Sequence, residues 1–163
     1  MIGDTKWYLG PLGPSWGDIS SYNTGKAVDM YKLERGDLIG NCAANSSYCP
    51  RARSWTGKIV LAYPSDYGFG ISGPNRGSCI ISSVAAYGHD YCWPYNWLKF
   101  QARSWLLTPV SYYSNSVMMV SRDGYLYRGE AYSGFTVRPT FYLKSNVKIT
   151  GGNGSPENPY TLG

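Results

Sequence analysis

Charged side chains are scarce in this sequence, since Asp, Glu, Lys and Arg make up 15% of its 163 residues. The usual proportion in a globular domain is about a quarter. Although the formal net charge is +5, the 15 Lys and Arg residues form no run anywhere in the chain. A protein that reads nucleic acid gathers its basic residues on one element or face, so we do not expect nucleic acid as a partner. Attraction to acidic glycans or to a cell envelope stays open.

Long apolar runs are missing as well. No stretch approaches the roughly 18 to 20 consecutive apolar residues that a membrane span requires, so we expect no membrane span in this chain. Residues 1–6 lead directly into residues 7–9, whose apolar character indicates a structural strand and not a signal peptide. No internal repeat, low-complexity segment or linker interrupts the sequence, and its length suits one domain. We therefore expect a single domain over residues 1–163.

Glycine and aromatic residues are abundant instead, with 20 Gly, 16 Tyr and 6 Trp. Low charge combined with many aromatic side chains argues against disorder, because there is enough apolar surface to bury. Frequent glycine and proline limit the length of helices. The composition thus favours a loop-rich α+β or all-β domain.

The first half of the chain predicts one helix and one buried strand. In residues 26–35, apolar side chains recur at helical spacing, which predicts a short amphipathic helix. Residues 55–63 read as a strand that Pro64 ends.

Turn and loop signals dominate the residues after Pro64. Residues 65–70 have turn composition, with Asp66 placed to cap the next segment. Residues 71–98 are expected to be irregular, and residues 146–150 to form a last strand before a terminal turn and a short final strand.

The most informative stretch is residues 104–144. Apolar runs at residues 105–107 and 141–143 resemble those that fill a sheet core. Between them, residues 117–127 predict a β-hairpin, because Asp123-Gly124 supplies the positive φ of a tight turn.

The segments around this hairpin are rich in Tyr, Ser, Asn and Gly, as in antibody paratopes. Alternation places Tyr125 and Tyr127 on the face of the strand opposite Leu126, and exposed aromatic rings tend to mark contacts. Because tyrosine also forms strands readily, a purely structural role stays open. We expect ligand contact through the loops around residues 110–116 and 122–134. The candidate ligand-binding residues are Tyr112, Tyr113, Asn115, Tyr125, Tyr127, Arg128, Tyr132 and Ser133.

The four cysteines form two local pairs by spacing. Their gaps fit a zinc knuckle poorly, so the simplest interpretation is two disulfides that each close a short loop. Three connectivities are possible, and such bridges would place the protein outside the reducing cytosol. The expected pairs are Cys42 with Cys49 and Cys79 with Cys92.

Signs of catalysis are few. The sole histidine, His89, is followed by Asp90, which could orient its imidazole, but no nucleophile accompanies the pair. The carboxylates are spread singly, and the Glu-Pro-Asn and Trp-Asn-Asp signatures of sugar-binding lectins are missing. We therefore expect no catalytic residue, no cofactor and no metal ligand. Arg138 is expected to be buried with a carboxylate or carbonyl partner.

Most tryptophans are assigned to the core, while Trp93, beside Pro94, is expected to be partly exposed. The tryptophans assigned to the core are Trp7, Trp16, Trp55, Trp97 and Trp105.

Short motifs over nearly the whole chain carry a resemblance to a known family. They are KWYLG (6–10), WTGKI (55–59), YPSDYG (63–68), NWL (96–98), WLLTP (105–109), VRP (137–139) and NPYTL (158–162). In these motifs the chain resembles C-terminal ectodomains of surface and pilin-like proteins of Gram-positive gut bacteria, related to the domain of unknown function numbered 6273. The apolar N-terminal helix of a pilin is not found in these residues, so the resemblance does not imply filament membership.

The resemblance implies a fold but no biochemistry. The fold is C-type lectin-like, in its formylglycine-generating-enzyme and variable-protein branch, where small sheets and two helices support long irregular loops. In variable proteins of that branch, retroelement-driven mutagenesis diversifies surface loops near the C-terminus.

Together these features predict an α+β, C-type lectin-like, disulfide-bonded recognition domain on the outside of a cell. Its expected partner is a protein or glycan on a host or microbial surface, and membership of a larger surface or pilus protein stays open. Two alternatives stay open as well: a structural filament subunit and a formylglycine-generating-type oxidase, which would need reactive cysteines and copper.

Overall fold

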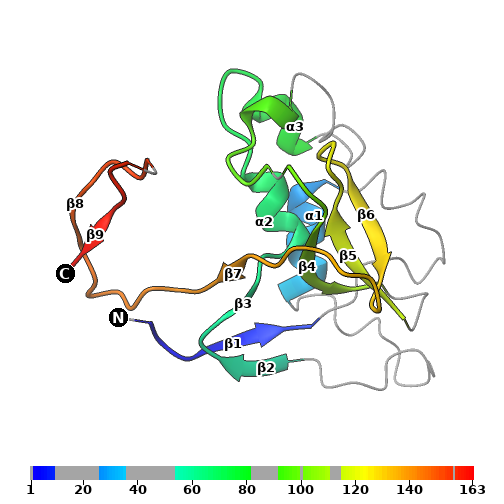
Figure 1. The fold of residues 1–163 in the computed structure, drawn as a ribbon, viewed down its shortest axis with the longest axis horizontal. Coiled ribbons are helices and arrows are strands. Elements are labelled where there is room, and N and C mark those ends of the chain that lie inside the picture. The colour runs from blue at the N-terminus through cyan, green and yellow to red at the C-terminus, as the bar shows by residue number, and fades with distance from the viewer. Residues whose placement is uncertain are drawn as a thin grey trace.

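The computed structural model describes residues 2–9, 26–35, 54–81, 92–99, 101–110, 115–155 and 157–163. Within these ranges the chain is mixed α/β, with small antiparallel sheets and short helices (Figure 1). This confirms the expected α+β class. None of the helices in these ranges is both long enough and apolar enough to cross a bilayer.

The largest described sheet has three antiparallel strands in the order β4 (Ser104–Pro109), β5 (Ser116–Val120) and β6 (Leu126–Glu130). Strands β5 and β6 form the predicted hairpin, and Gly124 in its turn has φ +81. The turn is closed by the Gly124 amide, which donates to the Ser121 carbonyl at 3.1 Å. The predicted turn at Asp123-Gly124 is therefore confirmed, and it forms because glycine adopts positive φ without steric cost.

One face of this sheet supplies the core. Leu106, Met118, Val120 and Leu126 are buried together with side chains from α1 (Ala27–Arg35) and α2 (Pro64–Phe69). The hydroxyl of Tyr67 on α2 donates to the Gly124 carbonyl at 2.9 Å. Helix α2 is therefore tied to the hairpin turn across the core, and Figure 1 shows both helices on one side of the sheet.

Helix α1 occupies the predicted segment, whereas α2 forms where only a turn was expected. Pro64 sits in the first turn of α2, where its missing N–H costs no hydrogen bond. The Asp66 carboxylate accepts the backbone N–H of Tyr63 at 3.0 Å, so Asp66 caps the start of α2, the helix in which it lies, and not the segment that follows.

A third helix, α3 (Arg76–Ile81), lies in the stretch expected to be irregular, and a 3-10 turn, η4 (Trp93–Tyr95), follows later. The disulfide Cys79–Cys92 joins them with a Cα–Cα distance of 5.8 Å, as predicted. Its sulfur atoms lie in the core, so the bridge holds α3 in place. The expected pair Cys42–Cys49 falls outside the described residues.

The single strand expected over residues 55–63 is in fact two strands with different partners. Strand β2 (Ser54–Gly57) pairs with β1 (Thr5–Tyr8), whereas β3 (Val60–Leu61) pairs with β7 (Pro139–Thr140). The division falls after Gly57, whose carbonyl accepts the Trp7 indole N–H at 2.8 Å. The last carbonyl of β2 is therefore bonded to a side chain.

The tryptophan assignment is right for Trp7, which is buried, and wrong for Trp55 and Trp97, which are exposed. Trp55 lies on the two-stranded sheet β1-β2, and this small sheet leaves its ring exposed. Trp105 and Trp93 are half-buried, so the expected partial exposure of Trp93 is confirmed. Trp16 lies outside the described ranges.

The chain after β7 leaves the body of the protein. Residues 141–143 were expected to fill a sheet core, but Phe141, Tyr142 and Leu143 are exposed. Tyr142 instead stacks on the buried Trp7 with ring centroids 5.0 Å apart, and so covers β1 from outside. Strands β8 (Ile149–Gly151) and β9 (Thr161–Leu162) then form a two-stranded ribbon that stands apart in Figure 1.

Candidate functional site

The outer face of the three-stranded sheet carries the predicted tyrosines. Trp105, Met119 and Tyr127 are direct cross-strand partners, so they form one row over β4, β5 and β6. Their neighbours in the next row point into the core, and Leu126 is 5% exposed while Tyr127 is 52% exposed. Tyr125 is also exposed. The expected outward orientation of the Tyr125 and Tyr127 rings is therefore confirmed.

An aromatic contact stiffens this face beside Tyr127. Phe135 packs on Trp105 with ring centroids 4.6 Å apart, and the Arg103 guanidinium lies 5.7 Å from the Phe135 ring. Gly129 lies beneath the two rings. A Cβ at this position would come within 2.6 Å of Phe135 and 2.8 Å of Trp105, so glycine allows the close contact. The segment after β6 therefore folds back over the sheet next to the exposed tyrosines.

Three further candidates meet at the open end of the hairpin. The Ala131 amide donates to the Asn115 carbonyl at 2.8 Å, and the Ser133 amide donates to the Glu130 carbonyl at 2.8 Å. Tyr132, in this turn, is 78% exposed and its hydroxyl donates to the Glu130 carboxylate. Asn115, Tyr132 and Ser133 thus share a turn whose backbone is held by hydrogen bonds.

The candidates form a strip and not a compact cluster. Tyr125 lies at the turn of the hairpin and Tyr132 beyond its open end, so about 20 Å of extended chain separates them. Arg128 follows Leu126 by two residues and so points to the opposite face of β6 from Tyr127. We refer to the outward-facing aromatic residues Tyr125, Tyr127 and Tyr132 as the tyrosine strip. Tyr112 and Tyr113 lie outside the described residues.

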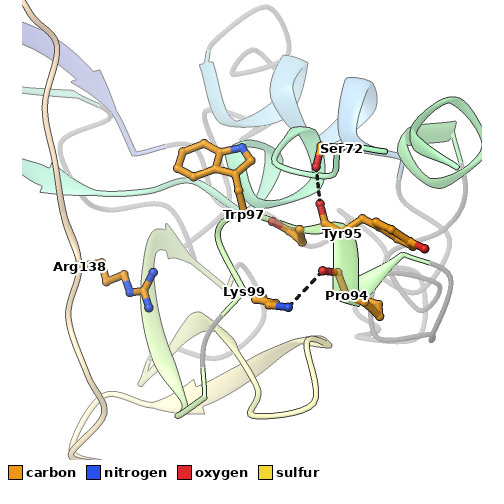
Figure 2. Close-up of a pocket in the computed structure, with 7 residues that line it drawn as sticks. Ser72, Pro94, Tyr95, Trp97, Lys99 and Arg138 are labelled. Atoms are coloured by element: carbon orange, nitrogen blue, oxygen red, sulfur yellow. Dashed lines mark hydrogen bonds between the residues drawn. The ribbon is translucent and has the colours of Figure 1, made fainter. Parts of the chain in front are cut away.

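Figure 2 shows a second feature, which the sequence did not reveal: an open concavity of about 500 Å³ beside η4. Trp97, predicted to be core, is 71% exposed at its edge. Its neighbour Asn96 is buried, and the Asn96 side chain donates to the Tyr67 carbonyl at 2.8 Å. Because Asn96 points inward, the adjacent Trp97 points outward. Arg138, predicted to be buried, is exposed here because residues 137–139 run along the outside of β3. Neighbouring atoms still desolvate the guanidinium in part, which lowers the pKa of Arg138.

The third feature is a buried polar cluster between α1 and α2. Glu34 is fully buried and accepts hydrogen bonds from the backbone N–H of Ser65, at 3.1 Å, and from the Ser65 hydroxyl. Burial raises the pKa of Glu34 from 4.5 to about 8. Arg35 donates to Asp66 at 2.6 Å and lies 4.2 Å from the Tyr63 ring, and burial raises the pKa of Tyr63 to about 12. Because Glu34 and Ser65 are closed to solvent, this cluster joins two helices and has no room for a substrate.

Metal and thiol chemistry find little support in the described ranges. No group of three or more His, Cys, Asp or Glu side chains gathers there as a metal site would require. Cys79 and Cys92 are consumed by their disulfide. His89, the candidate base, lies outside these ranges.

The chain matches no protein-family model, no curated protein and no solved structure. The chemistry of its own surfaces is therefore the basis for a functional assignment.

Proposed function

We propose that this chain is a non-catalytic, extracellular recognition domain of a bacterial surface or pilus-associated protein, and that the tyrosine strip is its contact surface. The supporting observation is the exposure of Tyr125, Tyr127 and Tyr132 along a sheet whose other face is the core. Exposed aromatic side chains that follow one another along a rigid sheet tend to mark contact surfaces, and tyrosine is enriched where partners bind.

The rigidity of the frame supports recognition in a second way. Binding costs less when the contact residues are already ordered in the free protein. Met119, the cross-strand partner of Tyr127, is buried, the open end of the hairpin is held by backbone hydrogen bonds, and its turn is tied to α2 through Tyr67. Little conformational entropy is therefore left to lose when a partner lands on this face.

The core disulfide supports the extracellular part of this proposal. The Cys79–Cys92 bridge is buried in the core, and structural disulfides persist in oxidising surroundings. We further propose the C-type lectin-like fold and the kinship with the domain of unknown function numbered 6273 that the sequence motifs imply. Small antiparallel sheets, short helices and a core disulfide support this assignment.

The experiment compares wild-type protein with the triple variant Tyr125→Ala, Tyr127→Ala, Tyr132→Ala on arrays of glycans and of host and bacterial surface proteins. Since hot-spot truncation costs about 2 kcal/mol or more, we expect the triple variant to lose at least roughly 30-fold in affinity. Thermal unfolding of both proteins shows that the fold is retained.

Tyr160→Ala is the matched control, because Tyr160 is 55% exposed, as Tyr127 is at 52%, but lies on the terminal ribbon. It should bind as wild type does. Unchanged binding by the triple variant would refute the assignment of this face. Concentration-dependent self-association without any array binding would favour a filament subunit instead.

A further inference from the structure

The concavity beside η4 combines an exposed indole with two cations. Its seven lining residues include Trp97, Lys99 and Arg138 and no carboxylate. Figure 2 shows Arg138 on a separate segment from Trp97 and Lys99, with the Lys99 ammonium between Arg138 and Pro94. The concavity is shallow and open to solvent, with a volume of about 500 Å³.

The floor of this concavity is rigid. Asn96 is 1% exposed, its amide donates to the Tyr67 carbonyl, and its side-chain oxygen accepts the Leu98 amide at 2.9 Å. The Cys79–Cys92 bridge anchors the start of the same segment to the core. Trp97 is therefore presented on a fixed turn and not on a loose loop.

The positive charge is placed at the rim. Lys99 donates to the Pro94 carbonyl at 3.1 Å and lies 5.7 Å from the Trp93 ring, so its ammonium is directed along the rim. Arg138 enters from the segment before β7, and arginine does not deprotonate in proteins. Two cations in the lining favour an anionic ligand, and a guanidinium binds carboxylate through paired hydrogen bonds.

The backbone of the rim argues against an extended peptide, which would bind by main-chain hydrogen bonds to free donors. The amides of Ser72, Asn96 and Trp97 already donate to the Tyr95, Trp93 and Gly70 carbonyls. The amides of Tyr95 and Lys99 are likewise used. These five amides are therefore not free to pair with a peptide main chain, whereas the lining side chains offer one flat ring and two cations.

We propose that this concavity binds a carboxylate-bearing pyranose, the unit of an acidic polysaccharide or glycan. The apolar C–H face of the sugar ring packs on the Trp97 indole, and its carboxylate accepts hydrogen bonds from Arg138 and Lys99. This site is separate from the tyrosine strip and does not depend on it. It also fits the net positive charge of the chain, which draws acidic glycans toward the surface.

Calorimetry and ligand-detected NMR with defined probes test the site. Methyl β-glucuronide is compared with methyl β-glucoside, which has the same ring without the carboxylate, and with the methyl glycoside of N-acetylneuraminic acid. A charge-assisted contact should favour a carboxylated sugar over the neutral one by about tenfold or more. The two acidic probes distinguish a uronic-acid polymer from a sialylated glycan as the source of the ligand.

Variants separate the two parts of the site. Arg138→Gln should abolish the preference for the carboxylate, while Trp97→Ala should weaken both sugars about tenfold or more. Trp97 is largely exposed, so this variant should melt as wild type does. Tyr127→Ala should leave sugar binding unchanged, which keeps failure of this site distinct from failure of the tyrosine strip.

Several results would overturn the proposal. Equal binding of the glucuronide and the glucoside, or binding of neither acidic sugar, would exclude it. So would tighter binding of a hexaglutamate peptide than of any sugar, since that outcome assigns the concavity to acidic peptides.

Discussion

Glu34 and Ser65 join helices α1 and α2 through two hydrogen bonds in a site from which solvent is excluded. The Ser65 amide donates to Glu34 Oε1 at 3.1 Å and the Ser65 hydroxyl donates to Oε2, and both residues are 0% exposed. The Arg35 guanidinium lies 3.6 Å from Oε2 but donates its shorter hydrogen bonds to Ser65 and Asp66. Removal from water therefore outweighs these contacts, and the pKa of Glu34 is raised to about 8.

A pH dependence of stability results from this shift. The unfolded chain releases the Glu34 proton near pH 4.5, whereas the folded chain holds it until about pH 8. Because the folded state binds more protons between these values, the free energy of unfolding should fall as pH rises, by at most about 1.4 kcal/mol per pH unit. Urea unfolding of wild type and Glu34→Gln at several pH values measures it. The variant should lack this part of the slope, and parallel curves would contradict the prediction.

Gly129 lies under the Phe135 and Trp105 rings, which predicts a loss of stability when a side chain is added there. In Gly129→Ala the new Cβ would come within 2.6 Å of Phe135 and 2.8 Å of Trp105, so one ring must move. Overpacking of this kind costs roughly 1–3 kcal/mol. Chemical denaturation measures the loss.

Gly134→Ala is its control, because nothing lies within 4 Å of a Cβ at that position and its φ is not positive. Its stability should stay within about 0.5 kcal/mol of wild type. Equal losses in the two variants would show that the Phe135–Trp105 contact is not what makes Gly129 necessary.

The disulfide predicts a third outcome. Removing Cys79–Cys92 in the double alanine variant opens a loop with a sequence separation of 13, for which a loss of about 3 kcal/mol is expected. Thermal or denaturant unfolding under non-reducing conditions reports this loss. A variant as stable as wild type would show that core packing alone holds α3.

Thiol quantification in denaturant completes that test and separates the function classes. The sequence predicts that Cys42 and Cys49 are also bridged, so the oxidised protein should show no free thiol. Two free thiols would leave a pair available for metal or redox chemistry and would favour the oxidase alternative over a recognition domain.

Local signals in the sequence were sufficient for the elements that depend on local physics. Asp123-Gly124 predicts a turn because glycine adopts positive φ readily. The apolar side chains of residues 26–35 recur at helical spacing. Alternation around Leu126 directs Tyr125 and Tyr127 outward. Each of these depends on backbone geometry within a few residues, and the structure confirms each one. The pairing of Cys79 with Cys92 belongs with them, because the sequence separation is short.

Tertiary structure alone decided which apolar residues are covered and which distant residues meet. Trp97 and residues 141–143 are as apolar as a core requires, but they lie exposed, even though Tyr142 stacks on Trp7. The break of the 55–63 strand depends on two different partners, β1 and β7, from opposite ends of the chain. The concavity likewise joins Ser72, residues 94–97, Lys99 and Arg138, whose meeting is set by the packing of α2, η4 and β7 and by no pattern within the sequence.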